Sequence, residues 1–245
     1  MAVRWRRLVH RFQTAPAALW ILAMALTGCT ENYPRTSLAP RSDFARLIDQ
    51  LFDITLGWGL VVFILVESLL VYIVWRYRQR GADDRPEQVH GHTRLEIAWT
   101  LVPIVILLFI GIPTVRTIFA TQENRPIPGA LQVRVVGHQW WWEFEYPELG
   151  ILTANELHLP VGRTASFDLQ SADIIHSFWV PRLGGKRDAI PPHTNRLWFT
   201  PDSAGTYLGQ CAEYCGASHA LMGFRVVADS PEDFEAWVAN QRRPA

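Results

Sequence analysis

The hydrophobic positions of this chain follow two different patterns, one before residue 120 and one after residue 130. Two apolar stretches, 54–75 and 95–119, are each long enough for the roughly 20 residues that span a bilayer. From residue 131 onward, apolar residues come in short alternating runs such as LQVRVV, ELHLP and RLWFT, bounded by Gly, Pro and Asp. The pattern predicts a two-helix transmembrane hairpin followed by an all-β domain.

The transmembrane hairpin is expected over residues 53–122, with helices at about 53–76 and 94–120. Thr93 and Glu96 have the spacing of a capping box at the start of the second helix. The loop between the helices carries the positive charge that keeps short loops in the cytoplasm, on Arg76, Arg78, Arg80, Arg85 and Arg94. The segments on both sides of the hairpin then lie outside the membrane.

The β domain is expected over residues 131–245, after an exported segment at 29–52, the hairpin, and a Pro-containing linker at 123–130. The number and spacing of its short runs favour one β-sandwich or small barrel. Near the end of the chain, Ser230 is placed to cap a short helix, and Pro231 fits the first turn of that helix.

Residues 1–28 have the features of a secretory signal, with a basic stretch (RWRR), an apolar stretch (AALWILAMAL) and small residues at the end. The ending LTGC resembles the lipobox of bacterial lipoproteins, in which the cysteine becomes the lipidated first residue of the mature chain. That cysteine is Cys29. An ordinary signal peptide or a third membrane helix are the alternatives. Export agrees with the orientation that the loop arginines indicate.

The overall charge does not identify a partner. The 23 Lys and Arg residues balance 23 Asp and Glu residues. Neither an excess of basic residues nor an acidic tail argues for a nucleic-acid partner.

Candidate chemistry is concentrated in the segment GQCAEYCGASHALMG, residues 209–223, which contains Cys211, Cys215, His219 and Met222. On a helix these four residues would form a stripe on one face, spread over roughly 16 Å. The segment is rich in glycine and follows a strand-like run, which favours a folded loop. Only a folded loop would let the four side chains bind one metal centre.

A disulfide between Cys211 and Cys215 is the first alternative, because an exported protein meets an oxidising environment. A histidine and a methionine add nothing to a disulfide, but they complete a soft set of ligands suited to copper. Two thiolates can also bridge two metal ions. A further ligand is expected from elsewhere in the domain, and His176 in DIIHSFWVP is the candidate among several competing histidines.

Four motifs together resemble subunit II of bacterial cytochrome c oxidase: LEIAWTLVP, GHQWWWEFEY, IIHSFWVPRLGGKRDAIP and GQCAEYCGASHALM. The resemblance covers the hairpin and the whole exported domain. It implies a cupredoxin-like Greek-key sandwich that holds CuA, a centre of two copper ions. The implied ligands are two bridging sulfurs, two ring nitrogens, one thioether and one backbone carbonyl, from Cys211, Cys215, His176, His219, Met222 and Glu213 respectively.

The resemblance also implies the function. The chain would be the electron-accepting subunit of a proton-pumping oxidase in the bacterial cell (inner) membrane, with the copper domain on the periplasmic face. It would take electrons from cytochrome c and pass them to haem in oxidase subunit I, where oxygen is reduced to water. Subunit I and subunit III are the expected membrane partners. Haem would be held only by the partner subunit.

In GHQWWWEFEY, strand alternation predicts His138, Trp140, Trp142, Phe144 and Tyr146 on one face. Trp142 is interpreted as a core residue. By the resemblance, Trp140 is the residue through which electrons arrive from cytochrome c. An acidic patch for a basic cytochrome is expected on the surface, formed by Glu143, Glu145, Asp168 and Asp173.

Three further carboxylates are singled out. Glu96 matches a residue at the entrance of a proton path into the catalytic subunit, although its role as a helix cap would alone explain it. Glu213 would also direct its carboxylate to a magnesium ion shared with that subunit. Glu67 lies inside the first apolar stretch, where an ionisable group costs on the order of 2.5 to 3.5 kcal/mol, so it is expected to face protein. Gly223 and Pro192 depart from the family pattern without removing a ligand.

Two rival functions remain. A quinol-oxidase subunit II would share the fold without copper, but those relatives lack the paired cysteines. A copper chaperone or carrier would not need two membrane helices and would keep a more exposed site.

Overall fold

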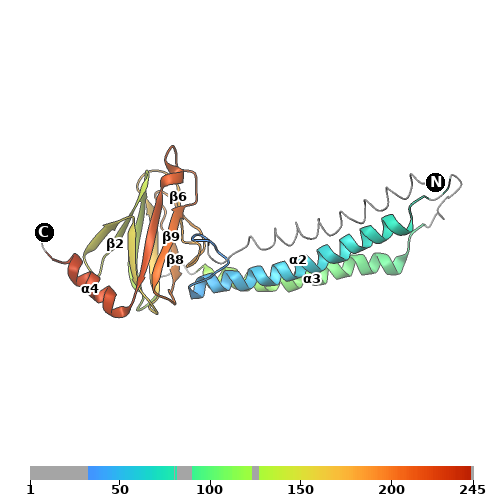
Figure 1. Cartoon of the computed structure of the whole chain (residues 1–245), viewed down its shortest axis with the longest axis horizontal. Coiled ribbons are helices and arrows are strands. Elements are labelled where there is room, and N and C mark those ends of the chain that lie inside the picture. Colours follow the sequence, from blue (N-terminus) through green and yellow to red (C-terminus); the bar gives the residue numbers. More distant parts are fainter. Residues whose placement is uncertain (1–32, 80, 82–89, 123–126, 244–245) are drawn as a thin grey trace, which may run out of the picture.

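The computed structural model describes residues 33–79, 81, 90–122 and 127–243. Two long helices lie side by side, and a β domain sits at one end of the pair (Figure 1). The expected signal at 1–28 and the lipidation site Cys29 lie outside the described residues.

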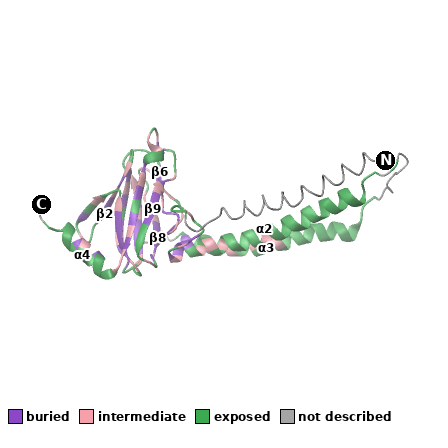
Figure 2. Cartoon of the chain, in the orientation of Figure 1, coloured by how far each residue is buried: buried purple, intermediate pink, exposed green. Residues whose placement is uncertain are grey.

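The helical hairpin consists of α2 (Asp43–Arg76) and α3 (Thr93–Thr121). Both helices are long and apolar enough to cross a membrane, and their outward side chains are exposed along most of their length (Figure 2). Trp58 of α2 stacks on Phe109 of α3 with ring centroids 5.4 Å apart. The hairpin confirms the expectation from the apolar stretches.

The start of α2 differs from the expectation. The helix begins at Asp43 and not near residue 53, because Ser42 caps it by accepting a hydrogen bond from the backbone N–H of Ala45 at 3.0 Å. The first turns of α2 are polar, and they form one unbroken helix with the apolar span that follows. The helix of 34 residues is about 51 Å long, which exceeds the hydrocarbon thickness of a bilayer and carries its start beyond the membrane core.

The cap of α3 also differs by one residue. His92, and not Thr93, is the N-cap, and its Nδ1 accepts a hydrogen bond from the backbone N–H of Leu95 at 3.4 Å. Glu96 completes the exchange, since its carboxylate accepts from the backbone N–H of His92 at 3.2 Å. The proposed pairing of Thr93 with Glu96 is wrong, but the capping role of Glu96 is confirmed.

The β domain is a sandwich of two five-stranded sheets, one in the order β3-β2-β1-β5-β8 and the other β4-β10-β9-β6-β7. Each sheet contains one parallel pair, β1 with β5 and β4 with β10. The strands are β1 Leu131–His138, β2 Trp141–Tyr146, β3 Ile151–Ala154, β4 Glu156–Pro160, β5 Ala165–Ser171, β6 His176–Trp179, β7 Arg187–Ala189, β8 Asn195–Phe199, β9 Gly205–Cys211 and β10 Gly223–Asp229. This confirms the cupredoxin-like sandwich behind the hairpin.

The core between the sheets is built from aromatic rings. Trp142 is fully buried and lies edge-on to Phe178 and Phe224, with centroids 5.6 Å apart in both pairs. Trp142, Phe144 and Tyr146 share the buried face of β2, as alternation predicts. The interpretation of Trp142 as a core residue is confirmed. Aromatic contacts of this kind hold the two sheets in fixed register.

The alternation fails at the start of that motif. Residues 139–140 form a turn between β1 and β2, so His138 lies on the opposite face from Trp142. His138 stacks on Trp141 at 4.2 Å, and Trp140 is left 37% exposed in the turn. The turn ends one strand before the next begins, so side chains do not alternate with a period of two residues from His138 to Trp142.

The last helix, α4 (Pro231–Gln241), follows the expected cap, since Ser230 Oγ accepts from the backbone N–H of Asp233 at 3.1 Å. Trp237 of α4 stacks on His158 of β4 at 4.4 Å. The His158 ring lies 2.7 Å from the Asp229 carboxylate and 3.1 Å from that of Glu156. His158 is therefore a structural residue that joins the helix to the sheet.

This cluster gives a prediction for stability against pH. The hydrogen bond from His158, with a smaller contribution from Arg225, lowers the pKa of Glu156. A carboxyl group with a lowered pKa in the folded state stabilises the fold above its unfolded pKa of about 4.3, and loses that effect as the pH falls through the folded value. Glu156→Gln should therefore destabilise the domain at pH 7 and have little effect at low pH.

Urea unfolding of the β domain at pH 7 and at the lowest pH at which the domain remains folded measures this difference. An equal loss of unfolding free energy at both pH values would show that the charge of Glu156 is not the cause.

Candidate metal centre

The cysteines, the histidine and the methionine of the 209–223 segment meet in a folded loop. Strand β9 ends at Cys211, a short 3-10 turn covers His219–Leu221, and β10 begins at Gly223. The loop expected from the glycines is confirmed, and the helical alternative is wrong. Gly209 lies inside β9, where an added Cβ would come 2.2 Å from the Phe224 ring, so close packing of this ring requires glycine there.

The two cysteines are free thiols whose sulfur atoms lie 3.8 Å apart. A disulfide has an S–S bond of about 2.05 Å, so the disulfide alternative does not describe this structure. His176, the first residue of β6, places its Nδ1 3.9 Å from the Cys211 sulfur. His219 places its Nδ1 3.5 Å from the Cys215 sulfur. His176, the candidate among several histidines in the sequence, is therefore one that the fold brings to the cysteines.

Two more groups complete the cluster. The Met222 sulfur lies 3.7 Å from the Cys215 sulfur, and the carbonyl oxygen of Glu213 lies 3.2 Å from the Cys211 sulfur. Each cysteine thus has one imidazole and one further donor on its own side. This arrangement offers two adjacent sets of donors that share the pair of thiols.

The cluster is buried, although it lies in a loop. His176 is fully buried, Cys215 and Met222 are 1% exposed, and Cys211 is 5% exposed. Burial and the neighbouring Cys211 thiol raise the pKa of Cys215 to about 12. Two thiolates at this separation therefore need cations beside them. Sulfur and imidazole donors are the soft ligands that copper prefers, so the donor set fits the copper centre implied by the sequence.

His176 is held in place by a carboxylate. Its Nε2 lies 2.7 Å from Asp173 Oδ1, which leaves Nδ1 directed at Cys211. Burial by itself would raise the pKa of Asp173, but hydrogen bonds from His176 and from the backbone N–H groups of Ile174 and Gln139 lower it. Metal-binding histidines commonly have such a partner on the second ring nitrogen. The Asp173-x-x-His176 spacing was the available signal for this contact.

Trp140 connects the surface to the cluster. Its Nε1–H donates to the carbonyl of Cys215 at 3.1 Å, and the Gln139 side chain donates to the same carbonyl at 2.9 Å. Gly216 has φ +118° and leaves room for the indole, since an added Cβ would lie 3.2 Å from Trp140. The indole is thus one hydrogen bond away from a candidate ligand residue. The sequence did not identify Gln139.

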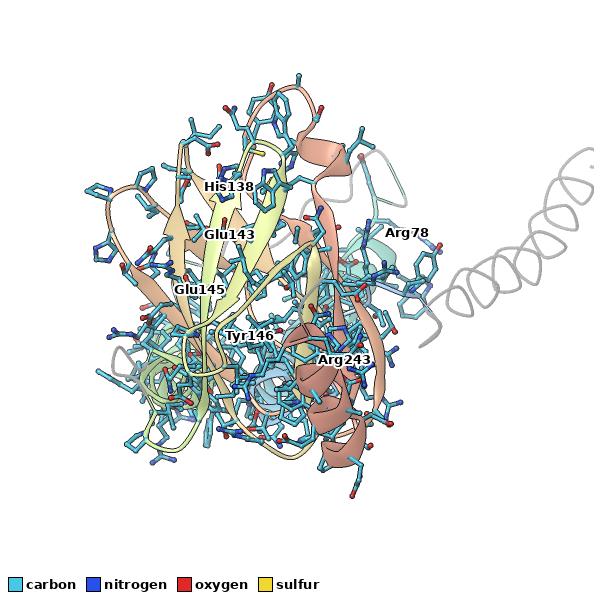
Figure 3. All side chains as sticks on the ribbon, turned by 90° about the vertical axis from the view of Figure 1, so that its left-hand side faces the viewer. Arg78, His138, Glu143, Glu145, Tyr146 and Arg243 are labelled. Carbon is cyan, nitrogen blue, oxygen red and sulfur yellow. The ribbon has the colours of Figure 1, made fainter. Side chains whose placement is uncertain are left out.

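The acidic residues expected to form a docking patch are all engaged within the chain. Glu143 lies 3.4 Å from His138, Glu145 pairs with Arg134, and Asp168 lies 2.7 Å from Arg196, while Asp173 holds His176. Figure 3 shows His138, Glu143 and Glu145 following one another along β1 and β2. These partners reduce the negative field that the acids present to solvent. Exposed apolar side chains lie in the turn between β1 and β2, at Trp140, and beside Asp173 in the connection between β5 and β6, at Ile174 and Ile175.

The remaining singled-out carboxylates do not join the cluster. Glu96 lies in the first turn of α3, which is the end of the hairpin away from the β domain (Figure 1). It lines a shallow pocket of about 300 Å³ with Thr93 and Thr100. Glu67 is exposed on α2 beside a pocket of about 430 Å³ that Tyr72 also lines. Glu213 is an exposed residue.

Comparison with known proteins supports the resemblance. The family model "Cytochrome C oxidase subunit II, transmembrane domain" matches residues 39–117, and "Cytochrome C oxidase subunit II, periplasmic domain" matches residues 150–229. Cytochrome c oxidase subunit 2 of Alkalihalophilus pseudofirmus is 38% identical over 90% of this chain and 66% of the relative. Quinol oxidase subunit 2 of Bacillus subtilis is 33% identical over 93% of this chain and 72% of the relative.

Among solved structures, the periplasmic domain of subunit II of cytochrome oxidase from Bradyrhizobium japonicum is 29% identical. The match covers 49% of this chain and 97% of the solved domain, with a TM-score of 0.46. The chain spans about two thirds of the length of the first curated relatives it matches.

Gly137 gives a prediction about the site. It packs directly against His176, and an added Cβ would come 2.8 Å from the imidazole Cδ2, well inside contact distance. Gly137→Ala should displace the ring and weaken or distort copper binding. Gly223→Ala is the matched control, because an added Cβ there meets only ordinary contacts at 3.6 Å. Copper titration followed by visible spectroscopy compares the two variants. Equal copper binding and spectra for both would contradict the packing argument.

Proposed function

Because this chain belongs to the cytochrome c oxidase subunit II family, we propose that it is the electron-accepting subunit of a proton-pumping cytochrome c oxidase. It takes electrons from cytochrome c and passes them to haem in oxidase subunit I, where oxygen is reduced to water. The observation that carries this proposal is the meeting of two buried free thiols with two imidazoles and a thioether.

The proposed cofactor is a pair of copper ions, which would supply reversible one-electron chemistry when bound. The residues that would hold the pair are Cys211, Cys215, His176, His219, Met222 and, through its carbonyl, Glu213. The two thiolates would balance the charge of two Cu(I) ions, and the buried, hydrogen-bonded donors would limit reorganisation of the surroundings.

The protein residues favour electron relay over catalysis at the metal. Burial of His176, Cys215 and Met222 keeps bulk water away from the donors. The hydrogen bond from His176 to Asp173 fixes the orientation of the imidazole. A catalytic metal site keeps a position open for water or substrate, whereas this donor set is closed. Trp140, bonded to the Cys215 carbonyl, is the proposed point at which electrons arrive.

Neither rival accounts for these features. A quinol-oxidase subunit II has no use for two cysteines and two histidines that converge in the core. A copper carrier needs to release its metal, whereas His176 is fully buried and fixed by a carboxylate.

The location, the partners and the roles of three further residues belong to the same proposed function. The chain would lie in the bacterial inner membrane with its copper domain on the periplasmic face, beside subunit I and subunit III, and Cys29 would be lipidated. Glu96 would stand near the entrance of a proton path. Glu213 would direct its exposed carboxylate to a magnesium ion shared with subunit I.

Copper loading tests the proposed function. Residues from about 125 onward are expected to fold alone, because among the described residues Phe44 is the only large side chain outside this range that joins the hydrophobic cluster between the sheets. The domain should bind two copper ions per chain and give an electron paramagnetic resonance spectrum of one unpaired electron shared over both. Replacing His219 or Met222 should alter that spectrum, whereas replacing His158 or His193 should not.

A metal-free Cys211–Cys215 disulfide in the native assembled complex would overturn the proposal. Binding of one copper ion with a mononuclear spectrum would overturn the dinuclear assignment.

Trp140 gives a separate prediction. Trp140→Phe removes the indole N–H that bonds the Cys215 carbonyl and should slow electron arrival from reduced cytochrome c by about tenfold or more, equivalent to roughly 1.4 kcal/mol of barrier. Trp141→Phe is the matched control, since Trp141 stacks on His138 outside the cluster. Stopped-flow reduction of the oxidase measures both. Equal rates for the two variants, with intact copper spectra, would remove Trp140 from the proposed path.

A further inference from the structure

Arg187 joins the end of the second transmembrane helix to the sheet that carries His176. Its Nη1 donates to the side-chain oxygen of Gln122 at 2.7 Å, and its Nη2 donates to the carbonyl of Thr121 at 3.2 Å. Thr121 is the last residue of α3, and Gln122 is the C-cap. The last carbonyls of a helix lack partners within the helix and carry partial negative charge, so a guanidinium is well suited to this position.

This contact is partly removed from water. Thr121 is only 9% exposed, and Arg187 is of intermediate burial, with an Nε that has no hydrogen-bond partner among the described residues. Burial lowers the pKa of Arg187, while the nearby Asp188 acts in the opposite direction. A planar fork that satisfies two acceptors at once fixes orientation as well as distance. A contact with this geometry restricts how the helix end moves against the sheet.

Strand β7 carries that restriction to the metal cluster. β7 pairs antiparallel with β6, so Arg187 lies opposite Phe178, and Ala189 lies opposite His176. β6 also pairs with β9, where Phe178 lies opposite Cys211. Two of the candidate ligand residues thus belong to the ladder whose outer strand holds the end of α3.

The other helix joins the domain at a different place. Phe44, in the first turn of α2, is 2% exposed and lies edge-on to Trp198 of β8 at 5.4 Å. Asp43 accepts a hydrogen bond from the backbone N–H of Thr200 at 2.8 Å.

The same end of α2 is also held by Ser42, whose hydroxyl donates to the carbonyl of Leu183, and by an ion pair between Arg46 and Asp202. The Arg187 contact attaches the other helix, α3, at a different strand, β7, and so opposes rotation of the domain about the α2 contacts.

We propose that Arg187 is a positioning residue for electron transfer. It holds the β domain in one orientation on the hairpin and thereby sets the separation between the copper centre and the acceptor in the catalytic subunit. This role rests on the proposed function of the chain, because it is the internal transfer step that requires the fixed orientation. Arg187 does not touch the metal donors and does not lie at the Trp140 turn.

The test uses the assembled oxidase with Arg187→Met and Arg187→Lys in this chain. Arg134→Met is the matched control, because it removes an arginine from an ion pair with Glu145 on a different sheet. Arg187→Met should leave copper content, the copper spectrum and reduction by cytochrome c unchanged, while slowing the internal transfer about tenfold, since small misplacements have large effects on rate. Compared with Arg187→Met, Arg187→Lys should restore only part of the rate of internal transfer. The restoration is incomplete because lysine cannot form the two-pronged contact.

Gln122→Leu removes the helix side of the contact and should slow the internal step in the same direction. The double variant should be no slower than Arg187→Met alone, because both changes break one interaction. Internal transfer in Arg187→Met as fast as in Arg134→Met would overturn the proposal. If the oxidase that carries Arg187→Met does not assemble, the Gln122→Leu oxidase provides the test. An unchanged rate of internal electron transfer in that variant would overturn the proposal.

A distance measurement separates this proposal from the proposed function. Spin labels carried by unnatural amino acids at Phe119 and Leu152, both exposed, report the pose of the domain on α3 without using the native cysteines. Arg187→Met should broaden the distance distribution in the full chain, and Arg134→Met should not. Unbroadened distances would overturn the positioning role even if copper binds. Absence of copper from the unmodified chain would overturn the proposed function instead.

Discussion

The structure depends on keeping two buried sulfur atoms close together without a bond between them. Cys211 and Cys215 lie 3.8 Å apart, and burial together with the neighbouring thiol raises the pKa of Cys215 to about 12. Both sulfurs can carry negative charge only if cations lie beside them. Each surrounding feature supports that condition: an imidazole on either side, a thioether, and a carboxylate that fixes the more buried imidazole. The fold therefore prepares a site for positive charge.

The sandwich gathers these donors at one of its ends. The loop between β9 and β10 supplies most of the donors, and the start of β6 supplies His176 from a neighbouring strand. The aromatic core behind the site, with Trp142 between His176 and Phe178, keeps these strands in register. The other end carries α4, fixed by the His158 cluster. The hairpin joins the domain through contacts at the start of α2, among them Phe44 and Asp43, and through Arg187 at the end of α3.

The sequence predicted those parts that depend on local pattern and composition. Apolar length identified the hairpin, alternation identified the sandwich, and the glycines identified the loop that gathers the cysteines. Features decided by contacts between distant segments could not be predicted in this way. The start of α2 depends on Ser42, whose hydroxyl also bonds the distant Leu183. The arginine partners of Glu145 and Asp168 come from neighbouring strands and were likewise not visible in the sequence. Asp173 and Arg187 act through residues that only the fold brings near them.

The central proposal is that Cys211 and Cys215 hold a pair of metal ions and form no disulfide. X-ray absorption at the copper edge of the purified full-length chain tests this claim most directly. The account predicts two sulfur neighbours for each copper and scattering from a second copper nearby. A copper surrounded only by nitrogen and oxygen, or sulfur absorption typical of a disulfide, would contradict it.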